Sequence, residues 1–106
     1  MKSKKIYIVA SVFYEELIDQ MIKGATEENN GMNDLNIIKV PGAFEIPGMV
    51  NCVIENQNPD LVIALGVLIK GESDHFEYIS SSVSNSISRL SIKNTIPIIF
   101  GVLTVH

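Results

Sequence analysis

The chain is 106 residues long, 46% of them hydrophobic and 19% charged, and its formal net charge at pH 7 is −4. This length and composition indicate one globular domain, residues 1–106, with a single core, and they argue against a disordered chain. Since no basic stripe, long apolar run or signal peptide is present, we expect no nucleic-acid or membrane partner and a cytoplasmic location.

A short β-type run opens the chain. Residues 5–10 (KIYIVA) are β-branched, aromatic or small, and they predict a buried strand. After a break at residues 11–13, apolar side chains recur at helical spacing, at Leu17, Ile18, Met21, Ile22 and Ala25. Asn29, Asn30 and Gly31 tolerate left-handed backbone and are expected to end this helix.

A second strand and a second helix follow. Residues 35–40 (LNIIKV) predict the strand, which Pro41 and Gly42 close. The next helical stripe, with Pro47 acceptable in its first turn, consists of Ile46, Met49, Val50, Val53 and Ile54. The single cysteine, Cys52, lies in this apolar run and is expected to fill space in the core or in an interface. It can form neither an internal disulfide nor a cysteine-based metal cage.

The third strand gives the clearest pattern. Residues 60–68 (DLVIALGVL) are almost continuously apolar, which is typical of a strand covered on both faces. A third helix is predicted next, with Ser73 or Asp74 as its cap. Its apolar residues follow at steps of three and four, at Phe76, Ile79, Val83, Ile87 and Leu90. After a polar exit at residues 94–95, residues 96–103 (IPIIFGVL) predict the last strand.

Strands and helices alternate along the whole chain. The order βαβαβαβ predicts an α/β domain with a four-stranded parallel sheet and right-handed crossovers. Three crossover helices leave one face of such a sheet thinly covered. Either a neighbouring subunit supplies the missing cover or the chain is shortened.

Serines are unusually frequent in the third helix. They are Ser80, Ser81, Ser82, Ser84, Ser86, Ser88 and Ser91. Because serine is a mediocre helix former, their number indicates either a solvent-exposed face or a close approach by another helix, for example from another subunit.

Three loops, residues 11–14, 41–45 and 71–75, are expected to meet at the carboxyl edge of the sheet, where open α/β sheets bind ligands. The first loop contains Phe13, which either stacks on a planar ring or packs into the core. The second contains Glu45, whose carboxylate either binds a polyol or amide ligand or simply stabilises a helix start.

The third loop (GESDH) combines an anion site with the internal histidine. Backbone amides at a helix start fit a phosphate, which Glu72 and Asp74 oppose unless their side chains point away. His75 is a candidate for proton transfer, the alternative being an exposed first-turn histidine without a task.

Four segments of the chain resemble the lumazine synthase family (6,7-dimethyl-8-ribityllumazine synthase), the penultimate enzyme of riboflavin biosynthesis. They are FYEELIDQMIKGA, VPGAFEIP, ALGVLIKGESDHFEYI and IPIIFGVLT, in an ordered match that runs from Ile6 to Thr104. PGAFE combined with the segment around HFEY is highly specific. The resemblance implies a flavodoxin-like three-layer sandwich from which the family's C-terminal helices are missing.

The activity that the resemblance implies is a transferase reaction. The amine of 5-amino-6-(D-ribitylamino)uracil forms an imine with 3,4-dihydroxy-2-butanone 4-phosphate, phosphate is eliminated, and the ring closes with loss of water. Neither a metal nor an organic cofactor is implied. The family sites lie between the subunits of a homopentamer, and some members assemble twelve pentamers into a 60-subunit shell.

The resemblance also implies roles for individual residues, carried over by position. His75 would be the general acid and base. The implied substrate-binding residues are, in chain order, Phe13 on the pyrimidine ring; Ala43, Phe44 and Glu45 on the ribityl chain; Val67, Leu68 and Ile69 along the pyrimidine pocket; Glu72 and Ser73 at the phosphate; and Phe100 from the adjacent subunit.

Three positions and the end of the chain depart from the family's pattern. Tyr14 stands where asparagine is usual, Lys70 where arginine is common, and Asp74 adds negative charge beside the phosphate site. Family members continue into C-terminal helices with an arginine that clamps the phosphate. If the chain ends at His106, we expect weak binding of the phosphate substrate.

Two other functions remain as alternatives to an active synthase. The first is a catalytically weak or inactive homologue that keeps the fold and assembly or binds flavin-like ligands. The second is a flavodoxin-like regulatory domain, which ranks low because no aspartate ends a strand to accept a phosphoryl group.

Overall fold

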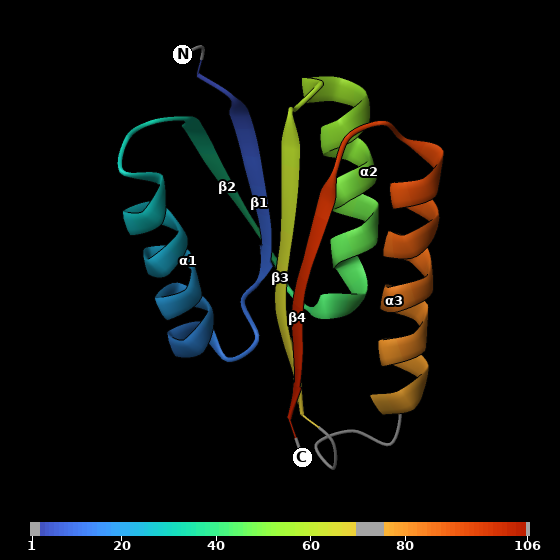
Figure 1. The fold of residues 1–106 in the computed structure, drawn as a ribbon. Helices are drawn as coiled ribbons and strands as arrows, with labels where there is room; N and C mark the ends of the chain where they lie inside the picture. Colours follow the sequence, from blue (N-terminus) through green and yellow to red (C-terminus); the bar gives the residue numbers. More distant parts are fainter. Residues whose placement is uncertain (1–2, 70–75, 106) are drawn as a thin grey trace.

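The computed structural model describes residues 3–69 and 76–105, which form a three-layer α/β domain with a sheet between helices (Figure 1). The alternation of strands and helices is confirmed. The elements are β1 (Lys5–Ser11), α1 (Glu15–Asn29), β2 (Asp34–Val40), the 3-10 turn η1 (Ala43–Glu45), α2 (Ile46–Gln57), β3 (Leu61–Ile69), α3 (Phe76–Lys93) and β4 (Ile98–Val105).

The four strands are all parallel, in the order β2-β1-β3-β4. This arrangement confirms the predicted parallel sheet and agrees with a flavodoxin-like fold. Because every strand runs in the same direction, the loops that follow β1, β2 and β3 leave the sheet at one edge. In Figure 1 this edge lies at the bottom, where α1 and α2 begin.

Two apolar clusters fill the space on the two faces of the sheet. One packs α2 and α3 against the sheet and includes Val9, Ile46, Val50, Ala64 and Val83. The other lies under α1 and consists of Ile8, Ala10, Ile18, Ile22, Leu65 and Val67. Neighbouring residues of β1 and β3 enter opposite clusters, as the two-residue period of a strand requires.

The face under α1 is only half covered, as three crossover helices predict. Helix α1 packs on β1 and β3, whereas β4 lies at the sheet edge beyond it (Figure 1). Ile99 and Leu103, which alternate with the inward-facing Ile98 and Val102, are 51% and 46% exposed.

Hydrogen bonds fasten the amino end of the sheet. The backbone N–H of Lys5 donates to Asp60 Oδ2 at 2.8 Å, and the N–H of Asp60 donates to the Lys5 carbonyl at 2.8 Å. The Lys5 ammonium donates to the Gln57 carbonyl at 2.7 Å, and the Lys4 N–H donates to Asn33 Oδ1 at 3.0 Å. The loops that precede β2 and β3 are thereby tied to the start of β1.

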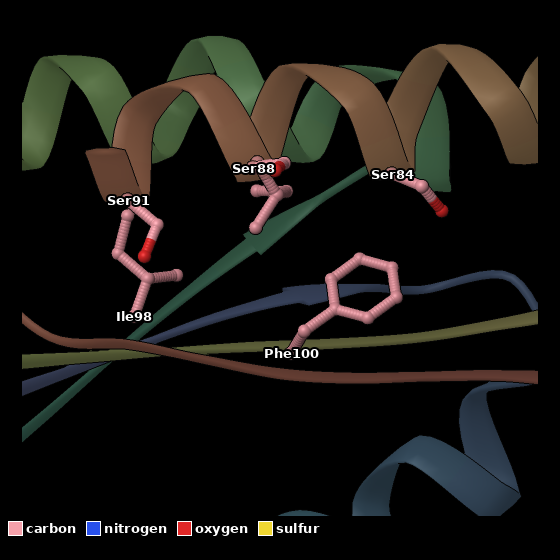
Figure 2. A pocket seen from close by; sticks show the side chains of 6 residues that line it. Ser84, Ser88, Ser91, Ile98 and Phe100 are labelled. Atoms are coloured by element: carbon pink, nitrogen blue, oxygen red, sulfur yellow. The ribbon is translucent and has the colours of Figure 1, made fainter. Parts of the chain in front are cut away.

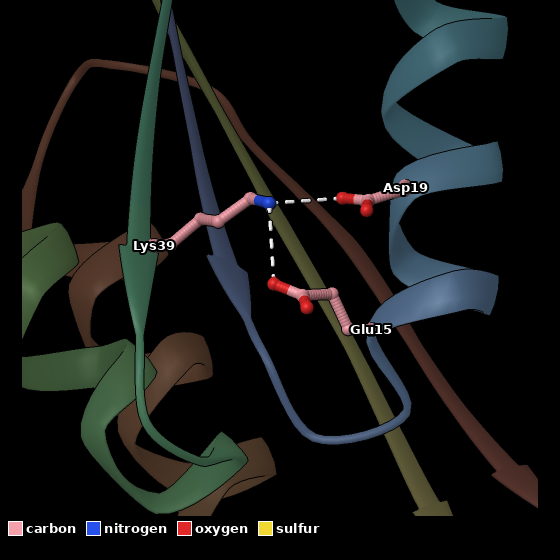
Figure 3. Close-up of polar contacts among 3 residues, drawn as sticks. All are labelled: Glu15, Asp19 and Lys39. Carbon is pink, nitrogen blue, oxygen red and sulfur yellow. Dashed lines mark hydrogen bonds and ion pairs between the residues drawn. The ribbon is translucent and has the colours of Figure 1, made fainter.

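An ion cluster joins α1 to the edge strand β2 (Figure 3). The ammonium of Lys39 lies 2.9 Å from Asp19 Oδ1 and 3.6 Å from Glu15 Oε2. The hydrogen bond to Asp19, supported by the charges of Asp19 and Glu15, raises the pKa of Lys39 above its ordinary value of 10.5. Since all three side chains are exposed, the cluster is expected to add little to the free energy of unfolding.

The structure corrects three expectations from the sequence. β1 includes Ser11, where we expected a break, and β4 begins at Ile98 rather than at residue 96. Cys52 is exposed, so the core alternative for this cysteine was wrong, and the interface alternative stays a prediction. The expected caps of α3, Ser73 and Asp74, lie outside the described residues.

Candidate functional site

The carboxyl edge of the sheet brings the loops after β1 and β2 together. The N–H of Val12 donates to the Val40 carbonyl at 2.8 Å, which joins the two strand ends directly. The turn η1, which follows β2, contacts both β1 and β3. Two of the three predicted loops therefore meet at this edge, and the turn of the second also lies against β3.

Phe13 is displayed at this edge rather than packed in the core. Its side chain is 50% exposed, and its neighbour Tyr14 is 37% exposed. The two rings meet edge to face, with centroids 4.7 Å apart and planes at 81°. Of the two alternatives for Phe13, the structure excludes core packing within this chain, and a ring at the end of β1 is open to stack on a planar ligand.

The PGAFE segment forms a compact turn with one buried and two exposed side chains. Ala43 is 5% exposed and packs into the core under α2, whereas Phe44 is 51% exposed and Glu45 is also exposed. The N–H of Glu45 donates to the Gly42 carbonyl at 3.1 Å. Glu45 Oε1 lies 3.4 Å from where a Cβ on Gly42 would stand, so the carboxylate folds back over this glycine. The buried Ala43 side chain anchors the turn, and the side chains of Phe44 and Glu45 are exposed.

The end of β3 runs past the pairing with β1. That pairing ends at Ala10 and Leu65, whereas the pairing with β4 continues to Ile69. Val67 is 1% exposed and packs under α1, and Leu68 packs toward the cluster on the opposite face. A ligand at this edge would therefore meet the backbone of residues 67–69 rather than the Val67 side chain.

The predicted phosphate and proton-transfer residues Glu72, Ser73 and His75 lie outside the described residues. Ile69 is the last residue of β3, and only its backbone is described. Within residues 3–69 and 76–105, no group of three or more His, Cys, Asp and Glu side chains could hold a metal ion. No helix in the same part of the chain is long and apolar enough to cross a membrane.

Phe100 lines a separate groove between β4 and α3 (Figure 2). The groove has a volume of about 320 Å³ and is lined by Ser84, Ile87, Ser88, Ser91, Ile98 and Phe100. Phe100 is 42% exposed and, through Ala64, is level with Val9 of β1, four residues before Phe13. Since β1 ends at Ser11, Phe100 lies two residues, roughly 7 Å at about 3.3 Å per residue, below the end of β1, and it is two strands, roughly 10 Å, away across the sheet. The structure does not bring Phe100 and Phe13 of one chain together.

The serines of α3 differ in their exposure. Ser81, Ser84, Ser88 and Ser91 are exposed and Ser82 and Ser86 are partly buried, a pattern that both alternatives for these serines allow. Three of these serines border the groove beside Phe100 (Figure 2). Both alternatives, a solvent-exposed face and a close approach by another helix, stay predictions.

A buried hydroxyl beneath the edge was not anticipated from the sequence. The Ser11 side chain is fully buried. Among the buried side-chain oxygens and nitrogens of the described residues, Ser11 Oγ stands out because it has no hydrogen-bond partner. Oγ lies 3.3 Å from where a Cβ on Gly66 would stand, and Ile46 Cδ1 lies 3.1 Å from the same point. A glycine facing Ser11 therefore leaves room for the hydroxyl but no partner.

Replacing Ser11 with alanine is expected to raise the free energy of unfolding by about 1 kcal/mol, because a buried hydroxyl without a partner costs roughly that much. Urea unfolding of both proteins at one concentration measures the change. Gly66→Ala is the matched control: its Cβ would crowd Ile46 and Ser11, so it is expected to lower stability. A loss of stability in Ser11→Ala would show that the hydroxyl has a partner in solution, such as a buried water.

Comparison with known proteins gives one consistent result. The model of the family "6,7-dimethyl-8-ribityllumazine synthase" matches residues 3–106. The curated protein of that name from Leuconostoc mesenteroides is 43% identical over 106 residues, covering 96% of this chain and 68% of the relative. The one from Pyrococcus furiosus is 42% identical over 101 residues (93% and 64%), and the one from Limosilactobacillus reuteri is 38% identical over 106 residues (98% and 70%). The chain spans about two-thirds of the length of these relatives.

Proposed function

Because the chain belongs to the 6,7-dimethyl-8-ribityllumazine synthase family, whose members act in riboflavin biosynthesis, we propose that it condenses 5-amino-6-(D-ribitylamino)uracil with 3,4-dihydroxy-2-butanone 4-phosphate. The product is 6,7-dimethyl-8-ribityllumazine. The observation that carries this proposal is the family match along residues 3–106, nearly the whole chain. The relatives described above bear the synthase's name, which favours an active enzyme over a non-catalytic homologue.

The pyrimidine would bind between Phe13 and the end of β3. The exposed ring of Phe13 supplies a flat surface for stacking. The edge of the uracil would pair with backbone groups of residues 67–69, since Val67 itself is buried under α1. This arrangement fits a small planar ring with donors and acceptors around its rim.

The ribityl chain would lie along the PGAFE turn. Glu45 is exposed and accepts hydrogen bonds from hydroxyl groups, and Phe44 beside it offers an apolar flank. Ala43 would contribute through its backbone, because its side chain belongs to the core. A carboxylate that folds over Gly42 keeps two acceptor oxygens close to exposed backbone.

Proton transfer and phosphate binding are assigned to residues 72–75 from the sequence. His75 would donate and accept the protons of imine formation, phosphate elimination and ring closure, because imidazole titrates near neutral pH. Glu72 and Ser73 would hold the phosphate through backbone amides, and Ser73 also through its hydroxyl. One water leaves in imine formation and a second in ring closure, inorganic phosphate leaves in the elimination, and the reaction needs no oxidant or reductant. Alignment of two bound reactants can supply roughly 7–11 kcal/mol of the barrier reduction.

A complete site would need a second copy of the chain. Within one chain, Phe100 lies two strands from β1, roughly 10 Å across the sheet, and level with Val9, two residues before the end of β1. It is partly exposed beside α3, where a neighbour could reach it. We infer a homo-oligomer, a pentamer or a shell of pentamers, in which Phe100 contacts the pyrimidine of the adjacent subunit. We also infer a cytoplasmic location, the expectation drawn from the sequence.

One experiment tests the activity and the assembly together. The purified protein is separated by size with light-scattering detection, and the fraction with the mass of five or more copies is mixed with both substrates. We expect lumazine absorbance to rise and inorganic phosphate to be released in equal amount. Reactions without protein or without the ketone are the controls. A folded oligomer that forms no lumazine above these controls contradicts the proposal and supports the non-catalytic alternative.

A further inference from the structure

Tyr14 adopts a backbone conformation that suits few side chains. Its φ is 61° and its ψ is 56°, in the left-handed region. Three described residues other than glycine have positive φ, and the other two are Asn30 and Asn58. Both asparagines follow helix ends, where a left-handed residue is ordinary. Asparagine tolerates this conformation well, whereas a bulky tyrosine is strained in it.

The left-handed turn at Tyr14 is fixed from both sides. The Tyr14 carbonyl accepts a hydrogen bond of 3.1 Å from the N–H of Ile18, which starts α1. On the other side of Phe13, the N–H of Val12 is held by the Val40 carbonyl. The chain must therefore pass from the sheet into α1 within three residues, and Tyr14 absorbs the change of direction.

Strain of this kind persists where the surrounding structure fixes the backbone, and it is found most often at ligand-binding sites. At the same backbone conformation, asparagine would remove the strain but would present no ring. Tyrosine places a ring 4.7 Å from the Phe13 ring, with the two planes at 81°. An edge-to-face pair fixes the tilt of both rings, and it leaves at least one face of Phe13 uncovered by Tyr14.

We propose that Tyr14 is a positioning residue that holds the ring of Phe13 at the angle needed to stack on the pyrimidine substrate. The inference rests on the proposed function, since Phe13 is the stacking residue assigned there. Tyr14 acts through Phe13 and increases affinity for the planar substrate by limiting the motion of a half-exposed ring.

The test compares Tyr14→Asn with Tyr14→Phe. Binding of 5-amino-6-(D-ribitylamino)uracil alone is measured by calorimetry, and the unfolding temperature is measured on the same samples. Tyr14→Asn is expected to weaken binding about 3- to 10-fold, the range that an aromatic pair is worth. Its unfolding temperature is expected to stay at or above that of the wild type, because relief of backbone strain offsets the lost ring contact. Tyr14→Phe keeps the ring and the strain, and it is expected to bind within about twofold of the wild type.

Steady-state kinetics add a readout that a purely structural role would not move. Tyr14→Asn should raise the KM for the pyrimidine substrate while kcat at saturation changes little. The inference is overturned if the wild type binds the pyrimidine and Tyr14→Asn binds it equally well. A wild type that binds no pyrimidine contradicts the proposed function instead. In that case, the Phe13 ring-proton shifts of wild type and Tyr14→Asn decide the positioning role: unchanged shifts overturn it, and a shift toward random-coil values supports it.

Discussion

Replacing His75 with alanine is expected to lower kcat for lumazine formation by about 10²- to 10⁴-fold, the usual contribution of a positioned general acid or base. Each chemical step of the proposed reaction moves a proton: imine formation, phosphate elimination and ring closure. The chain has two histidines, and the second, His106, follows the last strand. His75 is thus the histidine that the sequence places in the loop after β3, where ligands bind in this fold.

His106→Ala is the matched control for that experiment, since it removes the same side chain from a position without an assigned role. Both variants should keep the circular dichroism spectrum and the unfolding midpoint of the wild type. The rate is measured at saturating concentrations of both substrates, so that a loss of binding is not mistaken for a loss of chemistry. A His75→Ala rate equal to that of His106→Ala would remove the imidazole from the mechanism.

Replacing Ile46 with alanine is expected to lower the free energy of unfolding by about 2–5 kcal/mol. Ile46 is fully buried at the start of α2, and its Cδ1 lies against Gly66 on β3. The substitution removes three buried carbons and leaves a cavity where α2 meets the sheet. Because Glu45 directly precedes Ile46, we also expect weaker binding of the ribityl chain.

A graded series makes the Ile46 prediction specific. Ile46→Val deletes one methyl group and should cost about 0.5–1.5 kcal/mol. Ile92→Ala removes the same atoms from a side chain that is 84% exposed on α3, and it should change stability by about 0.5 kcal/mol or less. Urea unfolding at one fixed protein concentration measures all three. Equal losses for Ile46→Ala and Ile92→Ala would show that the start of α2 does not depend on this side chain.

Most of the fold was predictable because strands and helices repeat with different periods. In the predicted stripe of α2, Ile46, Val50, Val53 and Ile54 are buried, and Met49 is partly buried against the same cluster. The core alternative for Cys52 was wrong because an apolar neighbourhood in the sequence does not fix the side of the helix on which a residue lies. Cys52 lies two residues from Val50, about 200° around the helix, and therefore faces solvent.

The ends of strands depend on partners that the sequence does not identify. Ser11 belongs to β1 because it pairs with Val40, a contact between residues 29 positions apart. β4 starts after Pro97, whose nitrogen has no hydrogen to donate to a neighbouring strand. Ile99 and Leu103 of β4 are exposed because α1 packs on β1 and β3, which agrees with the expectation that one face of the sheet is thinly covered.

The candidate site was predictable at the level of loops and less so at the level of side chains. Parallel strands place Phe13 and the PGAFE turn at one edge, and the structure confirms that the loops after β1 and β2 meet there. The burial of Ala43 and Val67, and the contact between Phe13 and Tyr14, depend on packing and backbone conformation. These features could be found only in three dimensions.

The hydrogen bonds of Lys4 and Lys5 hold the loops at the amino end of the sheet, and they leave the loops at the carboxyl end unconstrained by these contacts. Asn33 and Asp60 anchor the loops before β2 and β3 at the end of the sheet opposite the candidate site. Insertions and exchanges in the opposite loops can therefore accumulate without loosening this anchorage. A sheet held at its amino end can therefore vary the loops at its carboxyl end, and with them its substrate preference, while the anchored end is kept.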